Sequence, residues 1–181
     1  RAYRLSQAPR TSYEAVVDGG SGDAMPLALE LLAADNVTVL QSGTPVGVGR
    51  AVSLKWQNTS AATVVNQTLR LRSGDCSANC GADDVYRVRF YDTTFAASRF
   101  NNSNGQASVL IVQNPTTSLV SGQAYFWSAS GALIGTHSFS LGARQMTTVV
   151  TPNLPSLAGK GGSITVAHTG GYGGLAGKIV A

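Results

Sequence analysis

ASVLIVQNPTTSLVSGQAYFWSASG, residues 107–131, is the stretch that decides the fold class of this chain. Its apolar run at 109–112 is rich in β-branched residues, which favours a strand covered on both faces. Asn114 and Pro115 end that strand, because asparagine promotes turns through its side-chain hydrogen bonds and proline has no amide hydrogen to donate to a sheet. A second segment with three adjacent aromatic residues follows. The stretch therefore predicts two strands joined by a turn.

An echo of this stretch, aligned without gaps, begins 56 residues earlier and covers residues 51–74. Both copies carry a Gln-Asn dipeptide where the first strand is expected to end. Recurrence at a fixed offset indicates repeated supersecondary units, although two unrelated strand pairs under the same constraints would look alike. The identical pairs are Gly49 and Gly105, Ala51 and Ala107, Leu54 and Leu110, Gln57 and Gln113, Asn58 and Asn114, Val64 and Val120, and Gln67 and Gln123.

Short alternating patterns elsewhere predict further strands. Residues 69–72 and 86–90 alternate apolar side chains with arginines, which is typical of strands with one solvated face. Residues 25–35 are ambiguous, because their composition suits a helix while Leu27, Leu29 and Leu31 alternate; we favour a strand there. No strong amphipathic helix competes with these patterns. The sequence predicts an all-β chain folded as antiparallel β-sandwiches.

The expected domain organisation has three parts. Residues 1–10 are polar and basic and are expected to form an N-terminal arm. Residues 11–104 are expected to form a first β-sandwich unit, and residues 105–181 a second, with the boundary in the polar segment 101–105. Because the second unit is short for an independent sandwich, the two units are expected to be tandem or fused through shared sheets.

Composition indicates an extracytoplasmic protein. Charged residues make up only 12% of the chain, about half of what cytosolic proteins usually carry. The formal net charge of +4 is dispersed, so nucleic-acid binding has little support. No apolar run approaches the roughly 20 residues that span a bilayer, so no transmembrane segment is expected in this chain. We expect the protein to be secreted or displayed at the cell surface.

Two groups of residues fit that compartment. Cys76 and Cys80 have no histidine nearby, and two ligands make a poor zinc site. Their spacing also differs from the Cys-x-x-Cys redox motif, so we expect a disulfide that closes a short loop. Four Asn-x-Ser/Thr sequons are candidate glycan acceptors in a eukaryotic secreted protein, or chance occurrences in a chain rich in these residues: Asn36, Asn58, Asn66 and Asn101.

The sequence offers no catalytic constellation, metal site or cofactor motif. The two histidines, His137 and His168, lack a Gly-x-Ser-x-Gly nucleophile motif, and no Walker loop is present. We expect no enzymatic activity and no cofactor. A ligand-binding face is the alternative to a plain solvated surface: four arginines could line up if their strands pair, and an exposed aromatic could stack on a sugar ring. These candidate ligand-binding residues are Arg70, Arg72, Arg87, Arg89 and Trp127.

The second half of the chain resembles uncharacterised immunoglobulin-like or fibronectin-like β-sandwich modules of secreted bacterial proteins. The resembling segments are Gln113-Asn114-Pro115, the strand at 122–127 with the Ser-Gly that follows it, and residues 162–168 with the Tyr-Gly-Gly at 172–174. The likeness covers residues 105–181, with a fainter echo in 48–92. It implies a spacer, adhesive unit or assembly subunit, and it carries over no catalytic residue.

Two functions are therefore expected from different classes. The first is a non-enzymatic extracellular structural, adhesive or assembly subunit, with a protein partner reached through self-assembly or a larger surface complex. In this hypothesis the arm at 1–10 pairs with the open sheet edge of a neighbour. The second is a carbohydrate-binding module that holds polysaccharide through exposed aromatics and an arginine-rich strand face.

Overall fold

The computed structural model describes residues 1–19, 27–46, 51–73 and 85–181. Within these ranges the chain is all-β and the recorded strand pairs are antiparallel, as predicted. The ambiguous segment contains strand β3 (Leu27–Leu32), in agreement with its alternating leucines. The only helical elements among the described residues are two 3-10 turns, η1 (Thr151–Asn153) and η2 (Pro155–Leu157). None of them is long and apolar enough to cross a membrane.

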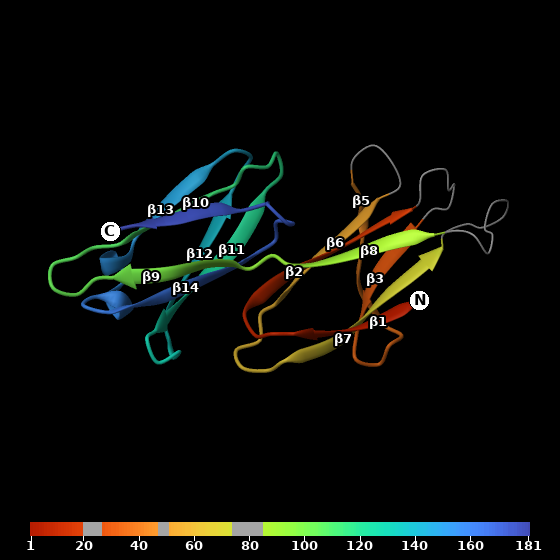
Figure 1. Ribbon diagram of the computed structural model, residues 1–181, viewed down its shortest axis with the longest axis horizontal. Coiled ribbons are helices and arrows are strands. Elements are labelled where there is room, and N and C mark those ends of the chain that lie inside the picture. Colours follow the sequence, from red (N-terminus) through yellow and green to blue (C-terminus); the bar gives the residue numbers. More distant parts are fainter. Residues whose placement is uncertain (20–26, 47–50, 74–84) are drawn as a thin grey trace. The chain divides into compact units, whose positions relative to one another are not determined.

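The chain separates into two compact units (Figure 1). Unit 1 comprises residues Arg1–Pro9 and Tyr13–Asp92, and unit 2 comprises Arg10–Ser12 and Thr93–Ala181. Each unit has its own cluster of buried apolar side chains.

The described residues of unit 1 form two four-stranded sheets. The first has the order β1-β7-β3-β4 and the second β5-β6-β2-β8. Side chains from both sheets fill one core, to which Leu29 and Leu69 contribute from the first sheet and Val17 and Leu54 from the second. The arrangement is sandwich-like, because each sheet buries one face against the other. The remaining strands are β1 (Ala2–Gln7), β2 (Thr11–Gly19), β4 (Val39–Ser42), β5 (Thr44–Pro45), β6 (Val52–Asn58), β7 (Val65–Ser73) and β8 (Tyr86–Asp92).

Unit 2 has one four-stranded and one three-stranded sheet, with the orders β12-β11-β14-β9 and β13-β10-β15. Its core again draws on both sheets: Phe126 and Ile164 come from the first, and Leu110 and Val149 from the second. Phe100 meets Phe126 edge-on, with 5.6 Å between ring centroids. The strands are β9 (Phe95–Asn101), β10 (Val109–Gln113), β11 (Val120–Ser128), β12 (Leu133–Leu141), β13 (Met146–Val150), β14 (Gly161–His168) and β15 (Ala176–Val180).

The structure corrects two expected boundaries. The predicted arm is not free, because β1 pairs along its whole length with β7 of the same chain, from Ala2 opposite Arg70 to Gln7 opposite Val65. The second unit begins at Thr93 rather than at residue 105, because the end of the segment that we assigned to the first unit contains β9, which pairs with β14. Both strands lie at a sheet edge and lack a regular alternation of apolar and polar side chains, so only their backbone partners reveal them.

Candidate functional site

The four-arginine face, which the sequence offered as an alternative to a plain solvated surface, does not form. Arg70 and Arg72 lie on β7, whereas Arg87 and Arg89 lie on β8, and these strands belong to different sheets of unit 1. Strand β7 is flanked by β1 and β3, so β8 has no place beside it. The prediction required the two strands to pair, and it is wrong for that reason.

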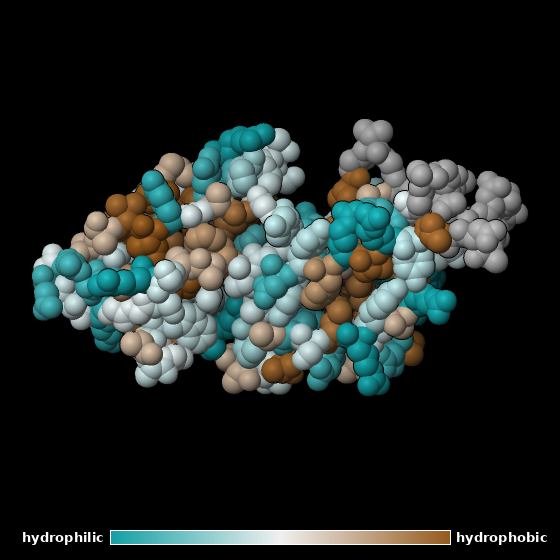
Figure 2. Space-filling model, in the orientation of Figure 1, coloured by the Kyte–Doolittle hydropathy of each residue, from teal (hydrophilic) through white to brown (hydrophobic). Residues whose placement is uncertain are grey.

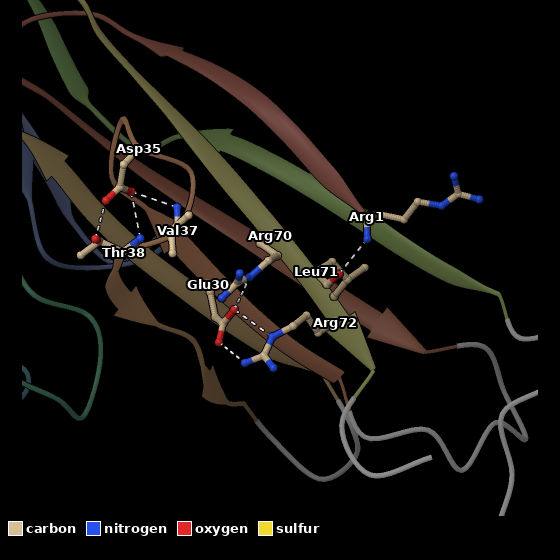
Figure 3. A network of polar contacts seen from close by, with 8 residues as sticks. All are labelled: Arg1, Glu30, Asp35, Val37, Thr38, Arg70, Leu71 and Arg72. Carbon is tan, nitrogen blue, oxygen red and sulfur yellow. Dashed lines mark hydrogen bonds and ion pairs between the residues drawn. The ribbon is translucent and has the colours of Figure 1, made fainter. Parts of the chain in front are cut away.

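Arg70 and Arg72 are instead joined to one carboxylate, that of Glu30 on β3 (Figure 3). Arg70 Nε donates to Glu30 Oε2 at 2.7 Å, Arg72 Nε donates to the same oxygen at 3.0 Å, and Arg72 Nη2 donates to Oε1. Glu30 is buried, and the hydrogen bond from Arg72 is the main cause that lowers the pKa of its carboxyl group, against the opposing effect of burial. These guanidinium groups are therefore committed to a cross-strand ion pair.

Strand β8 carries a second such pair. Arg89 contacts the carboxylate of Asp18 on the neighbouring strand β2. Arg87 stands directly opposite Asp18 in the same register and is exposed. Both arginines thus lie beside one acid on an exposed sheet face.

Trp127 does not offer an open stacking surface. Its Nε1 donates to Thr165 Oγ1 on β14 at 2.8 Å, and the guanidinium carbon of Arg10 lies 5.4 Å from its ring centroid. The same guanidinium lies 5.7 Å from the ring of Tyr125, whose phenol pKa is raised by burial and lowered to a smaller extent by the charge of Arg10. The other tryptophan, Trp56, is buried in the core of unit 1, stacked on Tyr13 with 5.8 Å between centroids.

The sequons differ in accessibility. Asn36 and Asn66 are exposed, and Asn101 is half-buried with its Nδ2 donating to Gln106 Oε1. Asn36 occupies a left-handed turn position (φ 58°), next to the Asp35 carboxylate that accepts from the amides of Val37 and Thr38 (Figure 3). Asn58 is buried, and its amide nitrogen donates to three backbone carbonyls. The prediction of a glycan acceptor at Asn58 is therefore wrong for the folded protein.

The predicted disulfide between Cys76 and Cys80 lies outside the described residues.

Asn58 has a structural role that its twin in unit 2 repeats. Asn58 Nδ2 donates to the carbonyls of Gln7, Ala8 and Thr63, at 3.1, 2.8 and 3.2 Å, and its Oδ1 accepts from the amide of Ser60. One amide side chain therefore fixes its own turn and also the end of strand β1. We call this arrangement an asparagine clasp.

The clasp of unit 2 is built on Asn114. Asn114 Nδ2 donates to the carbonyls of Ser118, Leu141 and Gly142, at 2.7, 3.0 and 2.9 Å, and its Oδ1 accepts from the amide of Thr116. Asn114 is fully buried. The repeated Gln-Asn dipeptide was the sequence signal for this pair, but the sequence did not reveal that each asparagine holds a third segment of chain.

That third segment is equivalent in the two units. For Asn58 it is the start of the connection from β1 to β2, and for Asn114 the start of the connection from β12 to β13; each connection leads from one sheet to another. Each connection contains an arginine in the left-handed region, Arg10 at φ 56° and Arg144 at φ 60°. Strand β1, which pairs with β7, is therefore the counterpart of β12, which pairs with β11.

An open groove lies in unit 2 where the edge strands of its two sheets, β9 and β15, come side by side without pairing to each other. The groove has a volume of about 520 Å³. Phe95, Ala97 and Ile179 form an apolar floor that packs against the core. Polar side chains line the rim: Ser98, Arg99, Asn101, Gln106, Ser108 and Lys178.

The charge of the chain is unevenly divided between the units. All nine Asp and Glu residues lie before Thr93, and residues 93–181 contain four cations and no carboxylate side chain. The whole formal net charge of +4 therefore belongs to residues 93–181. The net charge of the whole chain does not show this uneven division of charge, which becomes apparent when the charges are counted for each unit separately.

The outer face of the three-stranded sheet in unit 2 carries an apolar row. Val150, Val109 and Val180 stand side by side in register across β13, β10 and β15. Val150 and Val180 are exposed, as is Met146 on β13. Figure 2 shows apolar surface over this part of unit 2. An exposed apolar patch is a feature of surfaces that contact other proteins.

The described residues hold no group of three or more His, Cys, Asp or Glu side chains placed to bind a metal ion. His168 is buried, with Nε2 2.7 Å from the carbonyl oxygen of Thr93, and His137 is half-buried on β12.

Comparison with models of known protein families finds no match to this chain, and comparison with curated proteins finds no relative.

Proposed function

We propose that this protein is a non-enzymatic, extracytoplasmic structural, adhesive or assembly subunit built of two immunoglobulin-like β-sandwich modules. The observation that carries the proposal is the asparagine clasp, which recurs with the same donors and acceptors at Asn58 and Asn114. A repeated module whose most specific shared feature is a buried structural hydrogen-bond network serves the scaffold rather than a reaction.

The order of strands supports the immunoglobulin-like assignment of unit 2. In an immunoglobulin domain, strand C lies between F and C′, and strand B pairs with E. The five consecutive strands β10 to β14 fit B, C, C′, E and F, since β11 lies between β14 and β12, and β10 pairs with β13. The first and last strands depart from the pattern, because β9 lies beside β14 and β15 beside β10, the reverse of the usual A and G positions.

We propose no catalytic role for His137 and His168. A histidine base is usually oriented by a carboxylate, and residues 93–181 contain none. An assembly role is supported by the apolar row of Val109, Val150 and Val180 on an exposed sheet face. A donated N-terminal arm is no longer part of the proposal, because β1 is already paired with β7.

The test is the particle size of the protein from its natural source, measured by sedimentation together with electron microscopy. We expect filaments or a complex much larger than the 18.6 kDa chain. Substitution of the exposed Val150 and Val180 by threonine, which preserves β-branching, should reduce that size, whereas Val39→Thr on unit 1 is the matched control. A uniform monomer from the natural source would contradict the assembly role.

A further inference from the structure

We propose that the groove between β9 and β15 is a binding site for an acidic polysaccharide, one that carries carboxylate or sulfate groups. The inference rests on the proposed extracytoplasmic function and adds a ligand class and a site to it. The site differs from the arginine and tryptophan surface expected from the sequence.

The local structure of β9 places a cation at the groove. Phe100 pairs with Gly162 and Ala97 with Ile164, so Ser98 and Arg99 together stand opposite the single residue Ser163. This extra residue is a β-bulge, and bulges at sheet edges redirect side chains and interrupt pairing. Arg99 is exposed and lines the groove from this bulge.

Strand β15 supplies the second cation from the opposite side. Lys178 is exposed on β15 and lines the same groove. Between the two strands, Phe95 lies so close to Gly177 that a Cβ there would be 3.0 Å from the Phe95 ring. The glycine thus lets the half-buried Phe95 ring lie against β15 and form part of the groove lining, an aromatic surface on which a sugar ring can rest.

Charge complementarity determines the sign of the ligand. Arg99 and Lys178 have no carboxylate side chain within residues 93–181 to neutralise them, because that part of the sequence contains no Asp or Glu. A guanidinium group binds a carboxylate or sulfate through two parallel hydrogen bonds, and an ammonium group adds a second charge. Ser98 and Gln106 provide hydroxyl and amide groups suited to sugar hydroxyls.

An acidic peptide is the competing ligand, and the bulge disfavours it. A peptide would gain most of its affinity by adding a strand to the open edge of β9, with a regular ladder of main-chain hydrogen bonds. The bulge at Ser98 and Arg99 breaks that ladder in the middle of the strand. A polysaccharide needs no such ladder, because it is held through side chains.

The experiment is isothermal titration of the full chain with oligogalacturonate, with neutral dextran and poly-glutamate as comparison ligands. We expect binding to oligogalacturonate that weakens with added salt, and little binding to dextran. Arg99→Gln and Lys178→Gln should each weaken binding by about fivefold, and the double variant by more than about tenfold.

Arg144→Gln is the matched control, since it removes the same charge from an exposed arginine of the same unit outside the groove, and it should change affinity by less than about twofold. All three side chains are exposed, so the urea midpoints of the variants should be unchanged. No binding, or an equal loss in Arg144→Gln, would overturn the site. Poly-glutamate binding of equal strength that is lost in the same variants would assign the groove to a peptide and overturn the polysaccharide.

This result is separable from the particle-size test. Large particles with no oligogalacturonate binding would refute the groove alone. A monomer that binds oligogalacturonate through Arg99 and Lys178 would refute the assembly role and leave the groove in place.

Discussion

At the scale of single residues, the two clasp asparagines are expected to contribute strongly to the stability of their units. Each is buried, and each donates to three backbone carbonyls while accepting from an amide two residues further on. A buried carbonyl that loses its donor keeps its desolvation cost, so truncation of the side chain is expensive. The amide group is specifically required, because it supplies donors and an acceptor at once.

We predict that Asn114→Ala lowers the free energy of unfolding by about 2–3 kcal/mol, because it leaves buried carbonyls unpaired. Asn114→Asp should cost at least as much at neutral pH, since a carboxylate keeps the acceptor but cannot donate. Urea denaturation followed by fluorescence measures both. Asn66→Ala, at an exposed position, should stay within about 0.5 kcal/mol of the parent chain. A mild Asn114→Asp would show that the donors are unimportant.

At the scale of strands and sheets, the ion pairs of unit 1 connect neighbouring strands and hold them in register. Glu30 on β3 stands opposite Arg70 in the pairing with β7, and Arg72 reaches it from two residues along the same strand. A slip of β3 by one residue would move Glu30 to the opposite face of the sheet, away from both arginines. Protonation of the Glu30 carboxylate would therefore weaken the ion pairs that hold β3 and β7 in register.

We predict that unit 1 loses stability in acid through Glu30. Because the arginines lower the pKa of Glu30 in the folded state, its contribution is present above the ordinary carboxyl pKa of 4.5 and is lost as the pH falls through the folded value. Glu30→Gln should destabilise the protein by about 1–2 kcal/mol at pH 7, since both arginines are partly solvated. Urea midpoints across pH should converge for the two proteins at low pH. A constant difference would contradict the linkage.

We also predict that Gly162→Ala severely damages unit 2. A Cβ at Gly162 would lie 1.7 Å from the carbonyl oxygen of Trp127, so β11 and β14 would have to move apart beside the bulge. The expected cost is more than about 3 kcal/mol, at the upper end for overpacking. Gly19→Ala is the control, because the nearest atom to its Cβ would be 4.0 Å away. Thermal unfolding compares the two, and equal midpoints would refute the close approach.

At the scale of the whole molecule, each unit has its own asparagine clasp, but the chain segment that the asparagine holds lies in a different direction along the sequence. Asn58 holds carbonyls 50 residues upstream, whereas Asn114 holds carbonyls 27 residues downstream. The equivalent strand beside the clasp is β1 in one unit and β12 in the other. Unit 2 also includes Arg10–Ser12, which are distant in sequence from its other residues.

We predict that residues 93–181 expressed alone are less stable than unit 2 in the intact chain. They lack Ser12, whose carbonyl accepts from the amide of Thr93 at 2.9 Å, and Arg10, which covers Tyr125 and Trp127. Losing these contacts should cost about 1–3 kcal/mol. Amide hydrogen exchange of β11 and β14 in the two forms measures the difference. Equal protection would show that residues 10–12 do not stabilise unit 2.

Sequence alone determined the elements whose side chains alternate strongly. Leu69 and Leu71 are buried between the more exposed Arg70 and Arg72, and Leu110 and Val112 are buried on the central strand β10. Alternation predicts these strands because it reflects a local property, the burial of every second side chain. The all-β class and the Gln-Asn repeat follow from such local patterns.

Only the tertiary structure decided which strands are neighbours. It separated Arg70 and Arg72 from Arg87 and Arg89, paired β1 with β7, and brought Arg99 and Lys178 to one groove. Neighbouring strands are joined by main-chain hydrogen bonds. Because every residue except proline offers the same main-chain donor and acceptor, the sequence carries little signal about which strands pair. The candidate ligand site therefore moved from the predicted arginine face to a seam between sheet edges, which exists only once both sheets of unit 2 are assembled.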